Sequence, residues 1–471
     1  MKLKTDFKIP SHLARCITAE QAFHYRIVPQ TQNNGLLGLM TDNEPSPEFK
    51  AELSLILDAS LLLERIDSET LQNYLTANYR IGRRTTDNEL RFTPEFLENI
   101  LLTAKELDSS DIHFEPYENY CRVRFRLDGK LVEQYQIPLQ DYPPIVNKVK
   151  IRASMDIAEK RLPQDGRITV KKENDEFDIR VSCLPTLFGE KIVLRILKRD
   201  TQGLNLEALG FNPIELKRYK EATKIPNGII LISGPTGSGK TTTLYATLKL
   251  LNSEKTNILT IEDPIEYTLE GINQVQLKES IGLDFASALR TFLRQDPDII
   301  MVGEIRDEKT ANMAIRAALT GHLVLSTIHT NSAWATVSRL INMGIPPFLI
   351  ASTLNLSVAQ RLVRKLCPHC KVKQKIEKDL FPGGFKIPNR LSHHYIPMGC
   401  PKCHHTGYLG RKAIYEIIPI SKALSAEITD NALEVDSYLR ANNINTLQEN
   451  ALTLIEDGST SIEEAYPVLN N

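Results

Sequence analysis

Eight consecutive residues near the middle of the chain have the types and spacing of a phosphate-binding loop. They run from Gly234 to Thr241 and match the pattern G-x-x-x-x-G-K-[ST]. An apolar stretch of strand length, 228–233, precedes them, and a predicted helix follows. Glycines in this context let backbone N–H groups close around a polyphosphate, at which the positive end of the helix points. The sequence therefore predicts an ATP or GTP site formed by Gly234, Pro235, Thr236, Gly237, Ser238, Gly239, Lys240, Thr241 and Thr242.

Two residues of this loop and one acid beyond it have expected chemical roles. Lys240 would reach the β- and γ-phosphates, and the Thr241 hydroxyl would ligate Mg²⁺. Glu304 follows a second apolar strand, 298–302. Since ligands of open α/β sheets lie beyond the carboxyl ends of the strands, we expect Glu304 near the same Mg²⁺ or its waters. The alternative is an ordinary acid in a loop between a strand and a helix.

A cluster of acids follows the strand at 257–261. It contains Glu262, Asp263 and Glu266, which are suited to orienting the attacking water and to holding the metal and nucleotide. Spacing does not decide which carboxylate is the general base. Glu266 is the first candidate and Glu262 the second.

Two histidines flank the strand at 322–327, and three arginines lie near the acids. His322 precedes the strand and His329 follows it. An imidazole near a γ-phosphate would sense the nucleotide through a hydrogen bond, although a lone histidine is more often structural. Arg290, Arg294 and Arg306 fit ordinary solvated charges.

Four of the seven cysteines form two Cys-x-x-Cys pairs separated by 29 residues. Four thiolates are the ligand set of a closed, structural zinc site, and a reducing compartment favours metal over disulfide. We expect zinc bound by Cys367, Cys370, Cys400 and Cys403. Three nearby histidines are alternative ligands: His369, His404 and His405.

Composition limits the classes of function. The 57 Lys and Arg balance 58 Asp and Glu, which gives a formal charge of −1 and argues against a dedicated nucleic-acid binder. No run of 18 apolar residues and no signal peptide is present, so we expect a soluble, cytoplasmic protein.

The pattern along the chain predicts five segments. A small N-terminal domain spans 1–85, with one helical pattern from Leu53 to Leu63. An α+β domain spans 90–203 and begins with a helix opened by Thr93 and Pro94; its strands alternate apolar residues with arginines, as in 121–127. Strands at 257–261, 298–302 and 322–327 alternate with helices at 284–294, 307–319 and 332–342, which predicts a mostly parallel α/β sheet within 204–365. A cysteine element, 366–412, and a helical region, 413–471, follow.

Taken together, these motifs resemble the assembly ATPases of type II secretion and type IV pilus systems. The match comprises the phosphate loop, an aspartate box at 260–267, a Walker B region at 293–307 and a histidine box at 320–330. Upstream it includes 110–116 and 156–167, so it covers roughly residues 95 to 470. The tetracysteine element is typical of the extension motors of this family and absent from the retraction motors.

The resemblance implies a fold class and a set of residue roles. It implies a RecA-like P-loop ATPase domain preceded by an α+β, PAS-like domain, with ATP bound between them in a homohexameric ring. The family's sheet-domain arginines fall on Arg167, Arg180 and Arg195, which would stabilise charge on the transferred phosphoryl group.

The leading hypothesis is an ATP-driven motor for pilus or pseudopilus assembly. It implies recruitment to the inner membrane by platform and docking proteins, and no nucleic-acid partner. The alternatives are a RecA-like DNA-translocating motor and a ring scaffold that binds nucleotide without turnover.

Overall fold

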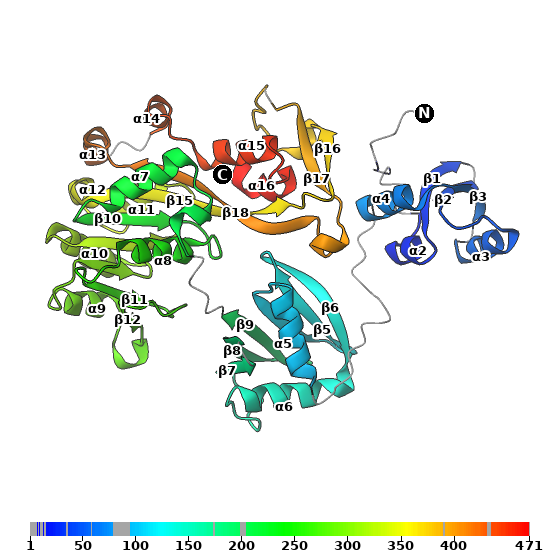
Figure 1. Ribbon diagram of the computed structural model, residues 1–471, viewed down its shortest axis with the longest axis horizontal. Coiled ribbons are helices and arrows are strands. Elements are labelled where there is room, and N and C mark those ends of the chain that lie inside the picture. Colours follow the sequence, from blue (N-terminus) through cyan, green and yellow to red (C-terminus); the bar gives the residue numbers. More distant parts are fainter. Residues whose placement is uncertain are drawn as a thin grey trace.

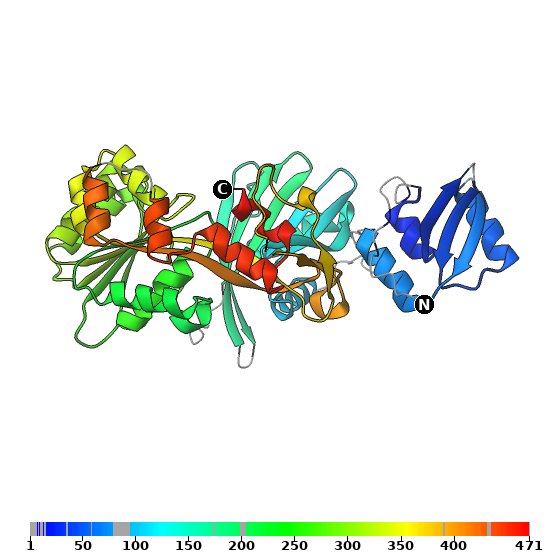
Figure 2. The same ribbon diagram turned by 90° about the horizontal axis from the view of Figure 1, so that it is seen from above.

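The computed structural model describes residues 16–33, 36–57, 59–78, 95–172, 175–197, 204–389, 391–430 and 435–470, together with Phe7, Ile9 and Leu13. Thr93 and Pro94, the predicted start of a helix, lie outside these residues. The N-terminal domain lies apart from the rest at one end of the molecule, as Figures 1 and 2 show.

The N-terminal domain is a three-stranded sheet with helices packed around it. Its elements are α2 (Ala19–His24), β1 (Ile27–Asn33), β2 (Leu36–Thr41), α3 (Pro47–Leu57), β3 (Ser60–Arg65) and α4 (Ser68–Asn78). Strand β2 pairs antiparallel with β1 and parallel with β3. The helical pattern expected from Leu53 to Leu63 is therefore wrong in its second half. The helix ends at Leu57, and Leu61 to Leu63 belong to β3, because pairing with β2 overrides the local apolar period.

The next domain is a six-stranded antiparallel sheet with two helices. It comprises α5 (Phe96–Glu106), β4 (Asp111–Pro116), β5 (Tyr120–Leu127), β6 (Lys130–Pro138), η2 (Leu139–Asp141), α6 (Tyr142–Arg152), β7 (Gln164–Lys172), β8 (Asp175–Thr186) and β9 (Gly189–Leu197), in the sheet order β6-β5-β4-β9-β8-β7. Apolar side chains of one sheet face pack with those of α5 and α6 into one core. Residues of β5 alternate strictly between buried and half-buried, which confirms the predicted split between an apolar face and an arginine-bearing face.

Within the described residues, seven strands form the sheet that carries the phosphate loop. Its order is β12-β11-β13-β14-β10-β15-β18, and all neighbours are parallel except β15 and β18. The strands are β10 (Gly228–Ser233), β11 (Ile258–Glu262), β12 (Asn273–Gln276), β13 (Ile299–Val302), β14 (Leu323–Ile328), β15 (Leu354–Leu366) and β18 (Tyr408–Pro419). The strands predicted from the sequence correspond to β11, β13 and β14, each displaced by about one residue at its bounds.

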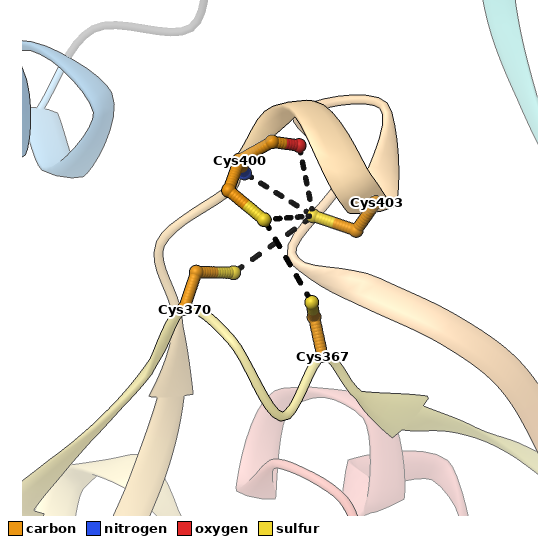
Figure 3. A group of neighbouring side chains, drawn as sticks. All are labelled: Cys367, Cys370, Cys400 and Cys403. Atoms are coloured by element: carbon orange, nitrogen blue, oxygen red, sulfur yellow. Dashed lines mark hydrogen bonds between the residues drawn. The ribbon is translucent and has the colours of Figure 1, made fainter.

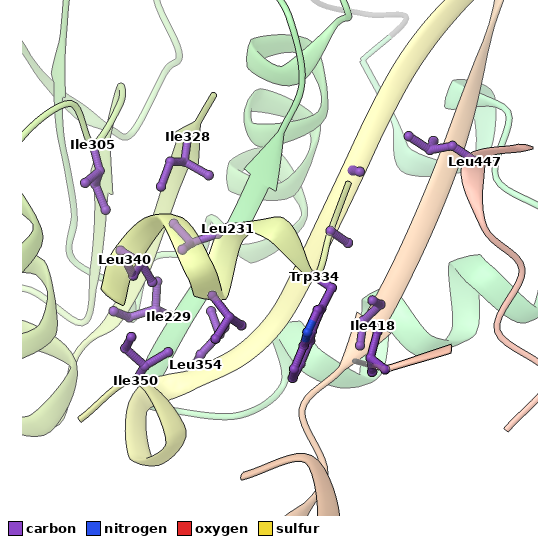
Figure 4. Close-up of a cluster of buried hydrophobic side chains, with 14 of the residues drawn as sticks. Ile229, Leu231, Ile305, Ile328, Trp334, Leu340, Ile350, Leu354, Ile418 and Leu447 are labelled. Atoms are coloured by element: carbon purple, nitrogen blue, oxygen red, sulfur yellow. The ribbon is translucent and has the colours of Figure 1, made fainter. Parts of the chain in front are cut away.

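Helices cover both faces of this sheet. One face packs with η3 (Leu206–Leu209), α7 (Pro213–Thr223) and α8 (Lys240–Leu251). The other packs with α9 (Phe285–Phe292), α10 (Glu308–Leu319), α11 (Ala335–Asn342) and α12 (Pro347–Thr353), while η4 (Glu279–Ile281) lies in a connection. Figure 4 shows that this second core extends from Ile229 and Leu231 of β10 to Ile418 of β18 and Leu447 beyond it. Because helices cover both faces, side chains on both sides of β10, β11, β13 and β14 are buried, and these strands are mainly apolar along their length.

The cysteine element is inserted between the two antiparallel strands β15 and β18. It contains β16 (Lys371–Lys375), η5 (Lys378–Leu380), β17 (His393–Pro397) and η6 (Pro401–Cys403). In the described residues after β18, the structure has four helices: α13 (Lys422–Thr429), α14 (Asp436–Ala441), α15 (Leu447–Glu456) and α16 (Ile462–Leu469). The predicted segment boundary at 412 and 413 falls inside β18, so the sheet continues beyond the element. No helix in the described ranges has the length and apolar character needed to cross a membrane.

Candidate active site and cysteine cluster

The phosphate loop lies between the end of β10, in the middle of the sheet, and the start of α8. Gly234 has φ +149° and Gly239 has φ +87°, a region that side-chain-bearing residues rarely adopt. A Cβ on Gly234 would lie 2.4 Å from the backbone O of Gln360, and one on Gly239 would lie 2.9 Å from the Gln360 amide nitrogen. Both positions therefore favour glycine by backbone conformation, and Gly234 is also required by the close approach of the β15 backbone.

Lys240 begins α8 and turns back over the loop. Its Nζ donates to the backbone O of Gly234 at 2.8 Å and of Pro235 at 3.0 Å. Burial lowers the pKa of Lys240 more than the charge of Glu304 raises it. Thr241 is exposed beside it. The ammonium of Lys240 thus lies against the phosphate loop at the start of α8.

A cavity of about 670 Å³ opens at this loop. The loop residues Gly234 to Ser238 line it, with His329 to Asn331, part of β15, α16 and the turn between β5 and β6. Its volume falls in the range of small-molecule sites. Because the β5–β6 turn belongs to the α+β domain, residues of two domains line the cavity.

Glu304 and His329 meet at the carboxyl ends of the adjacent strands β13 and β14. His329 Nε2 lies 3.3 Å from Glu304 Oε2, and Arg306 forms an ion pair with the other oxygen. Burial alone would raise the pKa of Glu304, but the hydrogen bond and charge of Arg306 outweigh it and lower the pKa. Glu304 is therefore held ionised, as a metal-binding or water-binding carboxylate must be.

Arg306, which fits an ordinary solvated charge from the sequence, is 52% exposed and also takes part in a cluster of ion pairs. Its guanidinium pairs with Glu304 and lies 3.7 Å from Asp263 Oδ2, so it joins the acids that follow β13 and β11. Arg306 and Asp263 are far apart in the sequence, so their pairing is not evident from it. They lie close together because the strands that precede them, β13 and β11, pair in parallel.

The two candidate bases have different surroundings. Glu262 is buried and accepts hydrogen bonds from Thr260 Oγ1 at 2.6 Å, from Gln274 Nε2 at 3.1 Å and from the Tyr245 hydroxyl. Its carboxylate ties α8 to β11. Glu266 is half-buried and its Oε2 lies 3.7 Å from Nη1 of Arg180. Of the two, Glu266 is the one with a carboxylate that faces the α+β domain.

The three predicted arginines form one row across β7, β8 and β9. Arg180 is the register partner of both Arg167 and Arg195. Arg180 Nη2 donates to the backbone O of Ile265 at 2.7 Å, which brings it to the aspartate box of the same chain. Arg167 pairs with Asp178 at 2.6 Å and Arg195 with Asp111 at 2.9 Å, yet their side chains remain 63% and 58% exposed.

His322 does not join this site within one chain. It precedes β14, and its backbone O accepts from Gly228 N at the start of β10, the strand end opposite the phosphate loop. Its Nδ1 lies 2.9 Å from the backbone O of Ala317. The structure thus places His329 at the cavity beside the phosphate loop and His322 about one strand length away.

Sequence reasoning missed Arg361, which lines the cavity from β15. The residue is buried, and it lies in an otherwise apolar strand segment with Leu362 and Val363. A cation within a buried strand is the signal that would have identified it, since arginine is rarely buried without a partner.

The four cysteines form a compact cluster at the junction of β15 and β18 (Figure 3). The Sγ atoms of Cys367 and Cys400 are 3.8 Å apart, those of Cys370 and Cys403 3.8 Å, and those of Cys400 and Cys403 3.7 Å. Zinc–sulfur bonds of about 2.3 Å in tetrahedral geometry require sulfurs about 3.8 Å apart. Among the described residues, these thiols form the group able to hold a metal ion, and it includes none of the three histidines. The donor set and its spacing fit zinc.

Comparison with known proteins identifies the family. A family model described as "Type II/IV secretion system protein" matches residues 86–466. The type IV pilus assembly ATPase PilB of Myxococcus xanthus is 50% identical over 372 residues, which cover 78% of this chain and 66% of that protein. The type II secretion system ATPase E of Vibrio cholerae is 46% identical over 365 residues, 76% of this chain and 72% of that protein. The chain thus spans about two thirds of the length of the PilB relative.

The fold is also similar to a crystal structure of the pilus retraction motor PilT with bound ADP. That structure is 26% identical, has a TM-score of 0.54, and the match covers 81% of this chain and 98% of that one. These names support the secretion and pilus hypothesis rather than the DNA-translocating motor weighed from the sequence. A family match over most of the chain and relatives at 46% and 50% identity show that this chain belongs to the family of type II/IV secretion system proteins.

Proposed function

We propose that this chain is an ATPase that powers pilus or pseudopilus assembly. The observation that carries the proposal is a phosphate loop with Lys240 turned back over it, beside a cavity lined by Gly234 to Ser238 and by His329, which contacts Glu304. Relatives named as ATPases of type IV pilus assembly and of type II secretion support it from sequence. Identity at 50% and 46% does not separate the two systems, so the proposal includes both.

The residues of this chain have distinct roles in hydrolysis. The loop amides and Lys240 bind the phosphates, while Thr241 and Glu304 hold Mg²⁺, which neutralises developing charge when bound. Glu266 is the proposed general base and positions water, because Glu262 already accepts three hydrogen bonds. Asp263 supports the nucleotide side of the same box, and His329 holds Glu304 in place.

The cysteine cluster holds a structural zinc ion in this proposal. With four thiolate ligands and no open position, the metal stabilises the cysteine element and takes no part in hydrolysis. We further propose a homohexameric ring that is recruited to the inner membrane by platform and docking proteins and does not bind nucleic acid. In the ring the exposed guanidinium groups of Arg167 and Arg195 serve the phosphoryl site together with Arg180.

Replacing the phosphate-loop lysine tests the ATPase assignment. Lys240→Ala is expected to lower phosphate release from MgATP at least about 100-fold, because one preorganised charge of the phosphoryl site is lost. Lys249→Ala, an exposed lysine at the end of the same helix, is the control and is expected to retain the wild-type rate. Wild-type hydrolysis by Lys240→Ala would refute the site. Nucleotide binding without any turnover by the wild-type protein, with Mg²⁺ and the membrane partner present, would favour a scaffold instead.

A further inference from the structure

Arg361 is a buried cation at the wall of the nucleotide cavity. The residue is 7% exposed and lines the cavity from β15. Its Nη1 donates to the backbone O of Gln360 at 3.0 Å and its Nη2 to the backbone O of Asn331 at 2.7 Å. Both acceptors are neutral carbonyls, and in the part of the chain that the structure describes the guanidinium has no ion pair. A guanidinium has five N–H donors, so donors remain for another acceptor.

The nearby acid Glu416 does not neutralise this charge. One of its oxygens accepts from the N–H of Ala333 at 2.7 Å and the other from the N–H of Leu447 at 3.2 Å. Burial lowers the pKa of Arg361 by more than the charge of Glu416 raises it. A buried cation without a counter-ion costs folding free energy, and a bound anion offsets that cost.

Arg361 also contacts the two loops that enclose the cavity. A Cβ on Gly234, the first residue of the phosphate loop, would lie 3.2 Å from its Nη1. On the other side it binds Asn331, two residues after His329 in the segment 329–334, which we call the histidine loop. Its charge acts on Lys240 as well, lowering that residue's pKa. Arg361 therefore lines the cavity and lies between the phosphate loop and the histidine loop, close enough to Lys240 for their charges to interact.

We propose that Arg361 is a second cation of the nucleotide site, which binds the phosphates of a nucleoside triphosphate together with Lys240 and holds the histidine loop against them. The inference rests on the proposed function, since it requires a nucleotide in this cavity. Planar guanidinium groups bind phosphate oxygens through paired, charge-assisted hydrogen bonds. Arg361 also binds the histidine loop, whose His329 contacts Glu304. We therefore expect loss of Arg361 to weaken the binding of a nucleoside triphosphate more than the binding of a diphosphate.

Calorimetric titration of the full chain with Mg-AMPPNP and with MgADP tests this role. Arg361→Met keeps an apolar stem of similar length and removes the charge, and is expected to weaken AMPPNP binding about 10- to 100-fold and ADP binding clearly less. Arg361→Lys is expected to recover part of that loss. The matched control is Lys365→Met, on the same strand, whose side chain is exposed and does not line this cavity. It is expected to bind both nucleotides within about twofold of wild type.

The outcomes separate this inference from the proposed function. If wild type and Lys365→Met bind neither nucleotide, the proposed function fails. If wild type binds and Arg361→Met binds AMPPNP equally well, the proposed function stands and the inference is overturned, even if the variant melts at a lower temperature. Should Arg361→Met fail to fold, Arg361→Lys decides: an unchanged ratio of AMPPNP to ADP affinity contradicts the inference, and a reduced ratio supports it.

Discussion

Glu115 is the acid on which the charged face of the α+β sheet is assembled. It is 7% exposed, and its two oxygens accept hydrogen bonds from Arg124 at 2.8 Å, from Lys191 at 3.0 Å and from Arg122 at 3.1 Å. Burial by itself would raise the pKa of Glu115, but the hydrogen bonds from Arg124 and Lys191 outweigh it and lower the pKa to about 2. One carboxylate thus organises cations of two strands, β5 and β9.

Removing this charge is expected to destabilise the α+β domain. Glu115→Gln leaves three cations without their counter-charge, which lowers the free energy of unfolding of β4 and β5 by about 3 kcal/mol at about pH 7. A depressed folded-state pKa stabilises the fold above the unfolded value of 4.5, and this contribution is lost as pH falls toward 2. The difference between variant and wild type should therefore shrink at about pH 3.

Amide hydrogen exchange of peptides that cover β4 and β5 measures this difference at each pH. Glu118→Gln, in the exposed turn between the two strands, is the control and should leave exchange unchanged. Equal protection in wild type and Glu115→Gln at neutral pH would contradict the role given to Glu115.

Individual site residues were predictable where their signal is local. Lys240 and Glu304 belong to short patterns at the ends of apolar strands, so sequence alone places them at the sheet edge. Arg306 and Arg361 carry no such pattern, because Asp263 beside Arg306 and Asn331 beside Arg361 come from distant parts of the sequence and are brought there by tertiary packing. The sequence around His322 matches the histidine box, yet the residue lies far from the cavity. Strand β14 follows it, so His322 is at the strand end opposite the phosphate loop of the same chain.

At the scale of elements, the cysteine cluster supports a structural metal. Four sulfurs from two Cys-x-x-Cys pairs lie where the chain enters and leaves an insertion whose described residues form a two-stranded sheet, β16 and β17, and two short 3-10 helices. An element this small gains much of its stability from the metal.

We expect about one zinc ion per chain in protein purified without added zinc. Cys400→Ser should reduce the zinc content several-fold and make residues 367–403 sensitive to protease, because a ligand of the metal is lost. Elemental analysis and limited proteolysis check this, with Cys16→Ser in the N-terminal domain as the control. A metal-free chain with an intact, protease-resistant element would refute the zinc assignment.

Helices and strands with a clear apolar pattern were the ones that the sequence predicted correctly. Strands β11, β13 and β14 were located to about one residue, because each is an apolar run ending at polar residues. The run Leu61 to Leu63 was assigned to a helix, since a short apolar run fits both periods and only pairing with β2 decides. Strand β18 was not predicted from the sequence. Its partner β15 is separated from it by the whole cysteine element, so the pairing leaves no local signal.

At the scale of the whole molecule, the arginine row joins the α+β domain to the ATPase domain. Arg180 contacts the aspartate box, while Arg167 and Arg195 keep more than half of their side chains exposed. In the proposed ring such groups complete the phosphoryl site, and an arginine of this kind contributes about 10³-fold or more to the rate.

Neutralising the row should therefore slow hydrolysis without dispersing the ring. Arg180→Gln is expected to lower kcat about 10³-fold in assembled protein, because charge on the transferred phosphoryl group loses a cation. Phosphate release measured on a ring isolated by size exclusion with light scattering tests it. Arg152→Gln, in α6 and paired with Glu98, is the control and should retain the wild-type rate. Undiminished turnover by Arg180→Gln rings would exclude a catalytic contribution from the row.

The antiparallel pairing of β15 with β18 has a consequence for how such motors diversify. The register brings Leu366 opposite Tyr408, so the two stems of the cysteine element emerge side by side from the same sheet edge. Topologically, the whole insertion is an enlarged hairpin loop. A loop of this kind can be gained, lost or replaced during evolution without a change in the strand order of the sheet. The cysteine element can therefore vary while the phosphate loop and the residues around it stay the same.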